Sequence, residues 1–570
     1  MGRRIRVILI LLLLLSVVAL FARAWIVGPR VKPGSVLLVD LSGAYAEAPP
    51  ADLVGRWLRH REPTLIELIT MLKKAAADER IKGVVLHVTQ LEIGWAKAQE
   101  IRDAIAAFKR SGKRIVSYLE QEVASGNIDY YVASAADQVF VPPGGSAPVT
   151  GLLSQFFFLG GVWEKLDIDM QVEKIREYKT AGDMLANKSM TPAHREMANS
   201  LLDSINGQFV GGIAAARGLD PKAVQTIIDD TPMTPAALAS SGLTDGVKFL
   251  DELRADLAGP QQAFLKQDEY QPPGREWPGL DQRPRLAVIY AVGPIHSGEA
   301  TGGVGGDSVG SETLIDAFDK AAADDGARAI VFRVDSPGGS ALASDLIWRA
   351  TQQARLKKPV IVSMSDVAGS GGYYIAAGGT RIVAEPGTLT GSIGVVMAKP
   401  NIRGLLAKLG VATESLTRGK FARLEDTTSS LTPLERAKVV AGMTHIYDVF
   451  VDRVAVGRQL TRERVNEIGR GRVWTGAQAK ENGLVDELGG FARAIEIAKE
   501  SVGIPVEQDV RLVFYPQRKG TLERLAQYID ARAVVSLPPG WQQALLAAFP
   551  AWDFPDGALL TLMSEQVQIR

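Results

Sequence analysis

Short apolar runs alternate along the chain with longer segments in which apolar residues recur every three to four positions. Residues 36–41 (Val-Leu-Leu-Val-Asp-Leu) and 286–292 (Leu-Ala-Val-Ile-Tyr-Ala-Val) are two such runs, and each is closely followed by glycine. Runs of this length are typical of buried strands, and the longer amphipathic segments predict helices. Strands that alternate with helices indicate βαβ units on a largely parallel sheet. The pattern therefore predicts an α/β fold.

The same order of strands and helices is found twice. Residues 64–67 (Thr-Leu-Ile-Glu) and 313–316 (Thr-Leu-Ile-Asp) are each followed by Ala-Ala-Ala-Asp and then by an apolar run. The offset between matching segments stays between 241 and 250 for further pairs: 115–117 with 361–363, 130–131 with 373–374, 191–192 with 432–433, and 234–245 with 475–486. Chance does not hold a register over such distances, so we predict a tandem duplicated domain.

This register divides the chain into five parts. A first repeat is expected over residues 31–260 and a second over 286–512, joined by a Pro-, Gln- and Gly-rich linker at 261–285. Residues 1–30 precede the first repeat. The tail, 513–570, has no counterpart in the first half and is assigned no chemistry.

The first 30 residues predict a transmembrane helix that acts as a signal anchor. Three arginines in the first six residues precede sixteen uncharged, mostly apolar residues (7–22), and the apolar character continues past Arg23 to Val27. About 20 apolar residues span a bilayer, and a basic flank stays on the cytoplasmic side. This orientation places the rest of the chain on the extracytoplasmic side. Cleavage of a signal peptide at Ala24 is the alternative, because residues 22–24 have a small-x-small pattern.

Composition excludes several classes of function. Lys and Arg together number 64, as do Asp and Glu, so the formal net charge is zero and gives no electrostatic reason to expect a nucleic-acid partner. The chain has no cysteine, which excludes disulfides, thiol nucleophiles and Cys-ligated metals. Its five histidines show no spacing typical of a metal site. We expect neither a metal nor an organic cofactor.

Two loops differ between the copies in a way that suggests chemistry. Residues 335–340 (Asp-Ser-Pro-Gly-Gly-Ser) follow a strand in the second copy, whereas the matching residues 89–92 contain no glycine. Ser370 lies among glycines at a strand–helix turn, where the first copy has Asn127. Glycine lets backbone N–H groups point into a site, as an oxyanion hole requires, and a serine at such a turn is presented to substrate. A plain turn and a serine N-cap are the alternatives, but they do not explain why the copies differ.

A serine nucleophile needs a general base to take its proton. Histidine is the usual base, and His296 is the nearest histidine in the second copy, although it lies in no matched motif. The alternative is a lysine whose pKa is lowered by burial from its usual value of about 10.4. The residues alone leave both possibilities open.

Four motifs of the second copy resemble those of the signal peptide peptidases of the SppA type, in their long, duplicated bacterial form. They are VDSPGGS at 334–340, AGSGGYYIA at 368–376, TLTGSIGV at 388–395 and VWTGAQAKENGLVDELGG at 473–490. The resemblance extends from the N-terminal segment to about residue 510. It implies a ClpP/crotonase-like fold in each repeat, a serine–lysine dyad, and a membrane-anchored homotetramer. It also implies hydrophobic peptide substrates, namely signal peptides left in the inner membrane, which are degraded from the periplasmic side.

Carried over residue by residue, the resemblance implies Ser370 as nucleophile and Lys179 as general base. Lys179 follows an aromatic residue and precedes Met-Thr-Pro at 190–192, as the family motif requires. The backbone N–H groups of Gly338 or Gly339, and of Gly371, are expected to form the oxyanion hole. The nucleophile would thus come from the second copy and the base from the first.

The second copy offers an alternative base. Counted from the paired tyrosines, Lys179 corresponds to Ala422, but counted from the Thr-Pro pair it corresponds to Lys420. The preceding aromatic residue favours Ala422, so Lys420 is the second choice.

Two other functions compete with a peptidase. A crotonase-like acyl-CoA enzyme would share the fold and the oxyanion glycines, but it would be cytoplasmic and would need no serine–lysine pair. A catalytically dead membrane scaffold is conceivable because the first copy has lost both the serine and the glycines. The complementary elements retained in the two copies favour the peptidase.

Overall fold

The computed structural model describes residues 31–48, 63–122, 126–146, 148–259, 263–270, 281–300, 302–303, 306–515 and 560–562. The predicted membrane anchor at 1–30 lies outside these residues. Among the residues that are described, no helix is both long and apolar enough to cross a bilayer.

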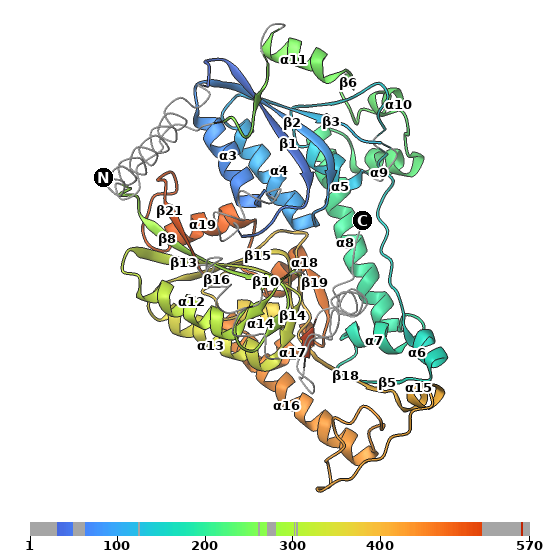
Figure 1. Cartoon of the computed structure of the whole chain (residues 1–570). Helices are drawn as coiled ribbons and strands as arrows, with labels where there is room; N and C mark the ends of the chain where they lie inside the picture. The colour runs from blue at the N-terminus through green and yellow to red at the C-terminus, as the bar shows by residue number, and fades with distance from the viewer. Residues whose placement is uncertain are drawn as a thin grey trace, which may run out of the picture.

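The first repeat is built on a six-stranded parallel sheet with the strand order β6-β4-β3-β2-β1-β7 (Figure 1). A large core that includes residues of α3, α4, α5 and α8 packs on one face, and α11 covers the other. The strands are β1 (Ser35–Gly43), β2 (Ile81–Leu91), β3 (Arg114–Leu119), β4 (Gln138–Val141), β6 (Gly246–Val247) and β7 (Leu265–Lys266). The helices are α3 (Leu65–Ala77), α4 (Trp95–Lys109), α5 (Asn127–Ala133), α8 (Pro192–Arg217), α9 (Pro221–Asp230), α10 (Pro235–Ser240) and α11 (Leu250–Ala258).

The second repeat has an eight-stranded sheet with the order β19-β17-β15-β13-β8-β21, in which β16 pairs with both β15 and β20. Helix α19 covers one face, as α11 does in the first repeat. The strands are β8 (Arg285–Val292), β13 (Ala327–Ser336), β15 (Val360–Gly369), β16 (Arg381–Ala384), β17 (Leu389–Gly391), β19 (Val473–Thr475), β20 (Glu487–Leu488) and β21 (Arg511–Tyr515). The helices are α12 (Ser311–Ala323), α13 (Ala341–Arg355), α14 (Gly371–Ala376), α16 (Pro433–Arg458), α17 (Arg462–Ile468), α18 (Gly476–Asn482) and α19 (Phe491–Glu500).

Matching interactions relate the two repeats. Helices α8 and α16 are both 26 residues long, and each begins with a threonine N-cap followed by proline. This start suits a helix because the threonine oxygen accepts an otherwise unpaired N–H and proline has none to lose. The buried hydroxyl of Tyr130 donates to the carbonyl of Leu243 at 2.6 Å, and that of Tyr373 donates to Leu484 at 2.9 Å. The predicted α/β duplication is confirmed.

A third sheet joins the repeats, with the order β12-β9-β14-β22-β18-β5. Its edge strand β5 belongs to the first repeat and pairs antiparallel with β18 of the second over seven residue pairs (Figure 1). The strands are β5 (Asp169–Ile175), β9 (Ile295–His296), β12 (Val309–Gly310), β14 (Gly338–Ser340), β18 (Val395–Asn401) and β22 (Leu560–Leu562). Beside it lie α6 (Gly160–Leu166), α7 (Ala181–Ala186) and α15 (Arg403–Lys408), and β10 (Gly302–Gly303) and β11 (Gly306–Asp307) form a separate pair.

The two buried tyrosine bonds should contribute equally to stability. Tyr130→Phe and Tyr373→Phe each leave a buried carbonyl without its partner, so each should lower the free energy of unfolding by about 1–3 kcal/mol. Urea denaturation would measure the loss. Tyr45→Phe is the control, because the hydrogen bond from that hydroxyl to the Asp40 carbonyl is long, at 3.4 Å. Equal stability of all three variants would contradict the prediction.

Candidate active site

The pairing of β5 with β18 brings the first repeat to the active-site loops of the second. Ile175 lies opposite Val395 in this antiparallel register. The chain beyond Ile175 therefore runs back along the residues that precede Val395, and Lys179 reaches Ser392. The lysine thus lies among the second-repeat loops because a first-repeat strand completes a second-repeat sheet.

Ser370 occupies the sharp turn between β15 and α14. Its φ of +54° and ψ of −116° lie in a region that non-glycine residues rarely adopt, a conformation that costs about 1–3 kcal/mol. The Ser370 N–H donates to the carbonyl of Gly391 at 2.8 Å, and the Ser370 carbonyl accepts from Tyr374 in the first turn of α14. These bonds hold the turn in place and aim the hydroxyl at the lysine.

Lys179 and Ser370 are in direct contact. The Lys179 Nζ lies 2.6 Å from the Ser370 Oγ, and it also lies 3.0 Å from the carbonyl oxygen and 2.9 Å from the Oγ of Ser392. Lys179 is 1% exposed and Ser370 is fully buried. Burial, with no opposing carboxylate, lowers the pKa of Lys179 well below its usual range. The structure thus brings together the two residues that the family resemblance implies as nucleophile and base.

Ser392 is the site residue that the sequence analysis missed. It contacts the amine with both its carbonyl and its hydroxyl, and it too has a positive φ of +54°. A signal for it was present in the sequence. Residues 390–391 (Thr-Gly) match 150–151 (Thr-Gly), and the next residue is Ser392 in one copy but Leu152 in the other. The comparison between copies that singled out Ser370 also distinguishes Ser392.

Two glycines form a narrow slot around Lys179. A Cβ on Gly471 would lie 2.4 Å from the Lys179 backbone N, and a Cβ on Gly394 would lie 3.1 Å from the Lys179 Cδ. The turn that contains Gly471, between α17 and β19, is itself tied to the site, because Tyr178 N–H donates to the Arg470 carbonyl and Ser392 N–H donates to the Arg472 carbonyl. Because Gly394 and Gly471 have no side chains, their backbone packs directly against the Lys179 side chain and excludes water from it.

The predicted oxyanion residues lie beside the serine turn. Gly338 and Gly339 form the start of β14 with φ values of +106° and +153°, and a Cβ on Gly339 would meet the Ile295 carbonyl oxygen at 2.0 Å. The Gly338 N–H donates to the Ser336 Oγ at 3.2 Å, a long bond. Gly371 is the first residue of α14, directly after Ser370. Only glycine fits the backbone at residue 339.

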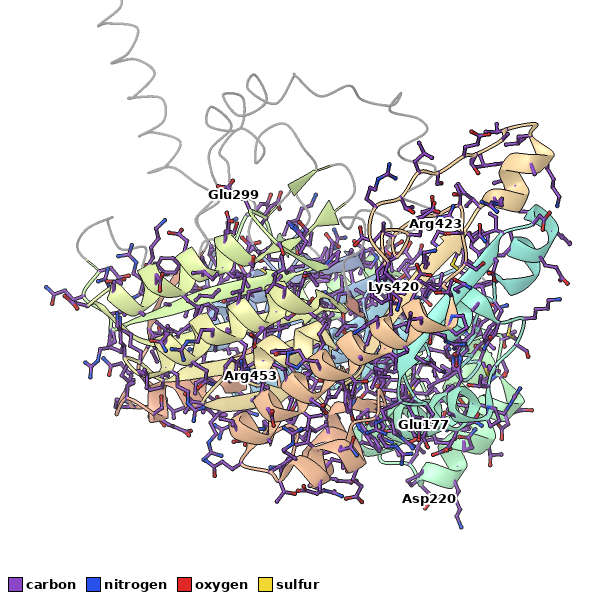
Figure 2. All side chains as sticks on the ribbon, turned by 90° about the horizontal axis from the view of Figure 1, so that it is seen from below. Glu177, Asp220, Glu299, Lys420, Arg423 and Arg453 are labelled. Atoms are coloured by element: carbon purple, nitrogen blue, oxygen red, sulfur yellow. The ribbon has the colours of Figure 1, made fainter. Side chains whose placement is uncertain are left out.

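The alternative bases lie elsewhere. Lys420 is exposed in the loop between α15 and α16 (Figure 2), whereas Ser370 is fully buried. The His296 ring contacts the Ser297 carbonyl through Nδ1 and the Ser308 hydroxyl through Nε2, both at 2.9 Å. Neither residue is hydrogen-bonded to Ser370 among the described contacts. No group of three histidine or acidic residues in the described ranges is arranged to hold a metal ion.

In the first copy, the residue at the position of Ser370 makes hydrogen bonds that hold a loop in place. Asn127, which matches Ser370, donates from its amide nitrogen to the carbonyl of Gly151 at 2.8 Å and accepts from Thr150 N–H at 3.0 Å. In the second copy the matching carbonyl of Gly391 accepts from the Ser370 backbone. The asparagine side chain therefore closes the loop that in the other copy surrounds Ser370.

Comparison with known proteins identifies the class. The model of peptidase family S49 matches twice, at residues 107–263 and 352–505, once in each repeat. The chain therefore belongs to peptidase family S49, and the serine peptidase class follows from this family. The resemblance to the SppA type is confirmed.

Named relatives match over most of the chain. It is 38% identical over 503 residues to the chloroplastic serine protease SPPA of Arabidopsis thaliana. The aligned region covers 87% of this chain and 72% of that protein. It is 31% identical over 543 residues to Protease 4 of Salmonella typhi, with 90% and 85% covered. Among solved structures, a mutant of ClpP1 from Listeria monocytogenes matches 36% of this chain and 94% of its own at 12% identity, with a TM-score of 0.25. The ClpP/crotonase likeness of each repeat stays a prediction.

Removal of the buried amine should stabilise the protein. Because the pKa of Lys179 is lowered in the folded state, the unfolded chain binds more protons below about pH 10.4, and folding must expel one. Lys179→Met should therefore raise the melting temperature at pH 7, and the gain should shrink as the pH rises toward 10. Calorimetry over this pH range measures it, and a gain that grows with pH would contradict the lowered pKa.

Gly471→Ala should impair the reaction more than it impairs the fold. Gly471 and Gly483 have φ values of +81° and +82°, so an alanine is equally strained at either position, but only at 471 does the new Cβ meet Lys179. We expect kcat to fall about 10- to 100-fold for Gly471→Ala, because small displacements of reacting groups have effects of this size. Gly483→Ala, with only Leu460 at 3.8 Å, is the control for strain. Equal kcat values in the two variants would exclude a role for this contact.

Proposed function

We propose that this chain is a membrane-anchored serine endopeptidase that degrades cleaved signal peptides through a Ser370–Lys179 dyad. The observation that carries the proposal is the 2.6 Å contact between the Lys179 amine and the Ser370 hydroxyl in a site from which water is excluded. Membership of family S49 and relatives named Protease 4 and serine protease SPPA support it.

The surroundings of Lys179 suit a neutral amine. A neutral amine has two N–H donors and one lone pair, and three oxygens lie around this nitrogen. The two N–H groups donate to the carbonyl and hydroxyl of Ser392, which leaves the lone pair to accept the proton of the Ser370 hydroxyl. Ser392 thus orients the base.

The reaction proceeds in two stages. As the Ser370 Oγ attacks a peptide carbonyl carbon, its proton passes to the Lys179 Nζ, and the carbonyl oxygen becomes an oxyanion. Backbone N–H groups of Gly338 or Gly339, and of Gly371, stabilise this charge, and one such donor typically contributes about 3 kcal/mol. Lys179 returns the proton to the leaving amine as the C–N bond breaks. Water, deprotonated by the same lysine, then hydrolyses the acyl-enzyme ester.

The third sheet provides a place for an extended peptide. The short segment β22 pairs antiparallel with β14 at Gly338–Ser340 and with β18 at Val396, on either side of it. The space between β14 and β18 therefore accepts a strand whose backbone runs past the oxyanion glycines. Recognition through main-chain hydrogen bonds fits substrates that share hydrophobic character rather than one sequence.

The cellular setting follows from the sequence. Residues 1–30 would anchor the protein in the inner membrane, with repeats 31–260 and 286–512, the linker 261–285 and the tail 513–570 on the periplasmic side. Hydrophobic peptides released into that membrane would be the partners. Assembly as a homotetramer, implied by the family resemblance, completes the proposal.

Labelling of the purified full chain with a fluorophosphonate tests the dyad, because an activated serine hydroxyl attacks its phosphorus and displaces fluoride. Ser370→Ala should abolish labelling, and Lys179→Met should slow it by about 10²- to 10⁴-fold, the usual contribution of a general base. Lys420→Met is the matched control and should label at the wild-type rate. The rate in the wild type should rise with pH and reach a plateau well below pH 10, because only the neutral amine acts.

Three outcomes would contradict the proposal. If Lys179→Met labels like the wild type, the base is Lys420 or a histidine. If the folded wild type does not label at all, the chain is a scaffold. If the wild type labels but does not cleave a synthetic signal peptide in detergent micelles, the dyad stands and the substrate class is wrong.

A further inference from the structure

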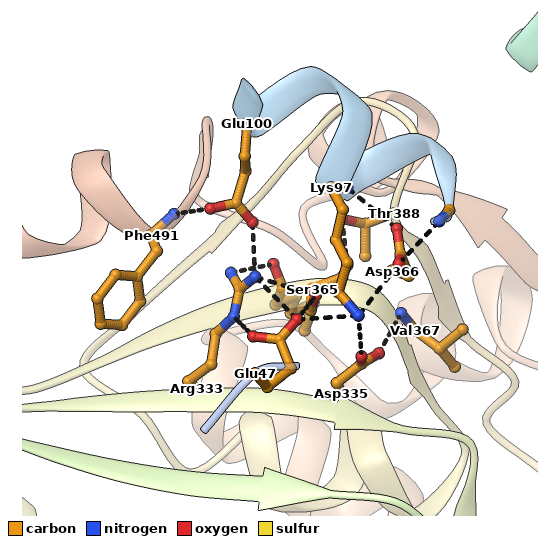
Figure 3. Close-up of polar contacts among 12 residues, drawn as sticks. Glu47, Lys97, Glu100, Arg333, Asp335, Ser365, Asp366, Val367, Thr388 and Phe491 are labelled. Atoms are coloured by element: carbon orange, nitrogen blue, oxygen red, sulfur yellow. Dashed lines mark hydrogen bonds and ion pairs between the residues drawn. The ribbon is translucent and has the colours of Figure 1, made fainter. Parts of the chain in front are cut away.

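A group of sheltered charged residues lies between the repeats (Figure 3). The mechanism above uses none of them. Glu47, Lys97 and Glu100 come from the first repeat, and Arg333, Asp335 and Asp366 come from the second. Arg333 is 1% exposed and balances Glu47 and Glu100. Lys97 faces the remaining carboxylates.

Lys97 binds three carboxylates at once. Its Nζ lies 3.1 Å from Asp335, 3.2 Å from Glu47 and 3.5 Å from Asp366. Burial disfavours the ammonium, yet these charges outweigh it and raise the pKa of Lys97. Within the described residues no other lysine or arginine pairs with Asp335 or Asp366. Without this amine, Asp335 and Asp366, whose side chains are only 16% and 18% exposed, lose their cation.

Both carboxylates are attached to the active-site loops. Asp335 immediately precedes Ser336, whose hydroxyl accepts the Gly338 N–H. The other Asp335 oxygen accepts from Val367 N–H at 3.1 Å, three residues before Ser370. Asp335 therefore ties the end of β13, which leads to the oxyanion glycines, to the end of β15, which leads to the nucleophile.

Asp366 ties the same strand to the first repeat. Its carboxylate accepts from the backbone N–H groups of Gly94 at 3.2 Å and Lys97 at 3.0 Å, at the start of α4. The N-cap residue Gly94 has no side chain to cap this helix, so a residue of the other repeat does so. The approach is close, since a Cβ on Gly94 would meet the Asp366 Cγ at 2.3 Å.

The arrangement is not repeated in the other half of the molecule. Lys97 is the third residue of α4, and the third residue of the equally long α13 is Ala343. Thr89 stands where the second copy has Asp335. A device that served folding alone would be expected in both copies, whereas this one occurs only beside the copy that carries Ser370.

We propose that Lys97 is a positioning residue for the peptidase reaction: through Asp335 and Asp366, the first repeat holds the oxyanion loop and the Ser370 turn of the second in register. This inference rests on the proposed function. The first repeat then supplies both the base and Lys97. We call Lys97 with Asp335 and Asp366 the clamp, because it aligns the nucleophile and its oxyanion donors.

Lys97→Met tests the clamp, with Lys97→Arg as the charge-retaining variant. We expect Lys97→Met to lower kcat for peptide cleavage by about 10- to 100-fold with KM within about twofold, because the reacting groups are displaced while the strand-binding space is kept. Lys97→Arg should recover at least half of the wild-type kcat. Arg217→Met is the control: it breaks the similarly sheltered ion pair with Asp245 at the far end of α8 and should lower the melting temperature without changing kcat.

A double variant separates positioning from simple loss of stability. Asp335→Asn keeps an oxygen for the Val367 N–H but removes one uncompensated charge, so Lys97→Met/Asp335→Asn should have a kcat at least about fivefold above that of Lys97→Met. A kcat for Lys97→Met equal to the wild-type value would overturn the proposal. The proposal would also be overturned if Lys97→Arg and the double variant both showed the full loss of kcat seen in Lys97→Met.

Fluorophosphonate labelling distinguishes this failure from failure of the dyad. If the wild type labels at Ser370 and Lys97→Met labels at the same rate, only the clamp is wrong. If the folded wild type does not label, the proposed function itself fails. Labelling of Lys97→Met that is slowed in proportion to its kcat supports the clamp.

Discussion

The antiparallel pairing of β5 with β18 is the constraint on which the rest of the site depends. Seven residue pairs fix the register, and the register decides which residues of the first repeat pass the serine turn. A shift by one residue would reverse the faces of the strand and turn the lysine segment away. The site is thus precise because it continues a sheet rather than resting on a free loop.

Two sheltered lysines of the first repeat show how their surroundings decide whether the amine is charged. Lys97 lies among three carboxylates, which raise its pKa and keep it an ammonium. Lys179 meets only the oxygens of two serines, and burial lowers its pKa. The same side chain is a paired cation in one place and, in the proposed dyad, a base in the other. Position along the sequence does not distinguish the two.

Much of the fold could be predicted from the sequence, because apolar periodicity and the register between the two copies can be recognised in short segments. The α/β class and the duplication follow from them, and Ser370 follows from the comparison between copies. Strand β7, inside the predicted linker, was not foreseen because two residues carry no periodicity. Pairing Lys179 with Ser370 needed the family resemblance, since 191 residues separate them. The comparison between copies also distinguishes Ser392, but the contacts that give Ser392 and Lys97 their roles span 213 and 238 residues, and no local pattern records them.

Asn127 shows what the duplication means for the molecule as a whole. Its amide, bonded to Thr150 and Gly151, occupies the place that Ser370 has in the second copy, and it carries no hydroxyl. A pair of identical repeats would build two reaction centres by symmetry, whereas this chain has the parts for one. In the proposed dyad each half supplies one residue that the other lacks, the lysine from one and the serine from the other. The duplication therefore makes the two halves of this chain dependent on each other rather than redundant.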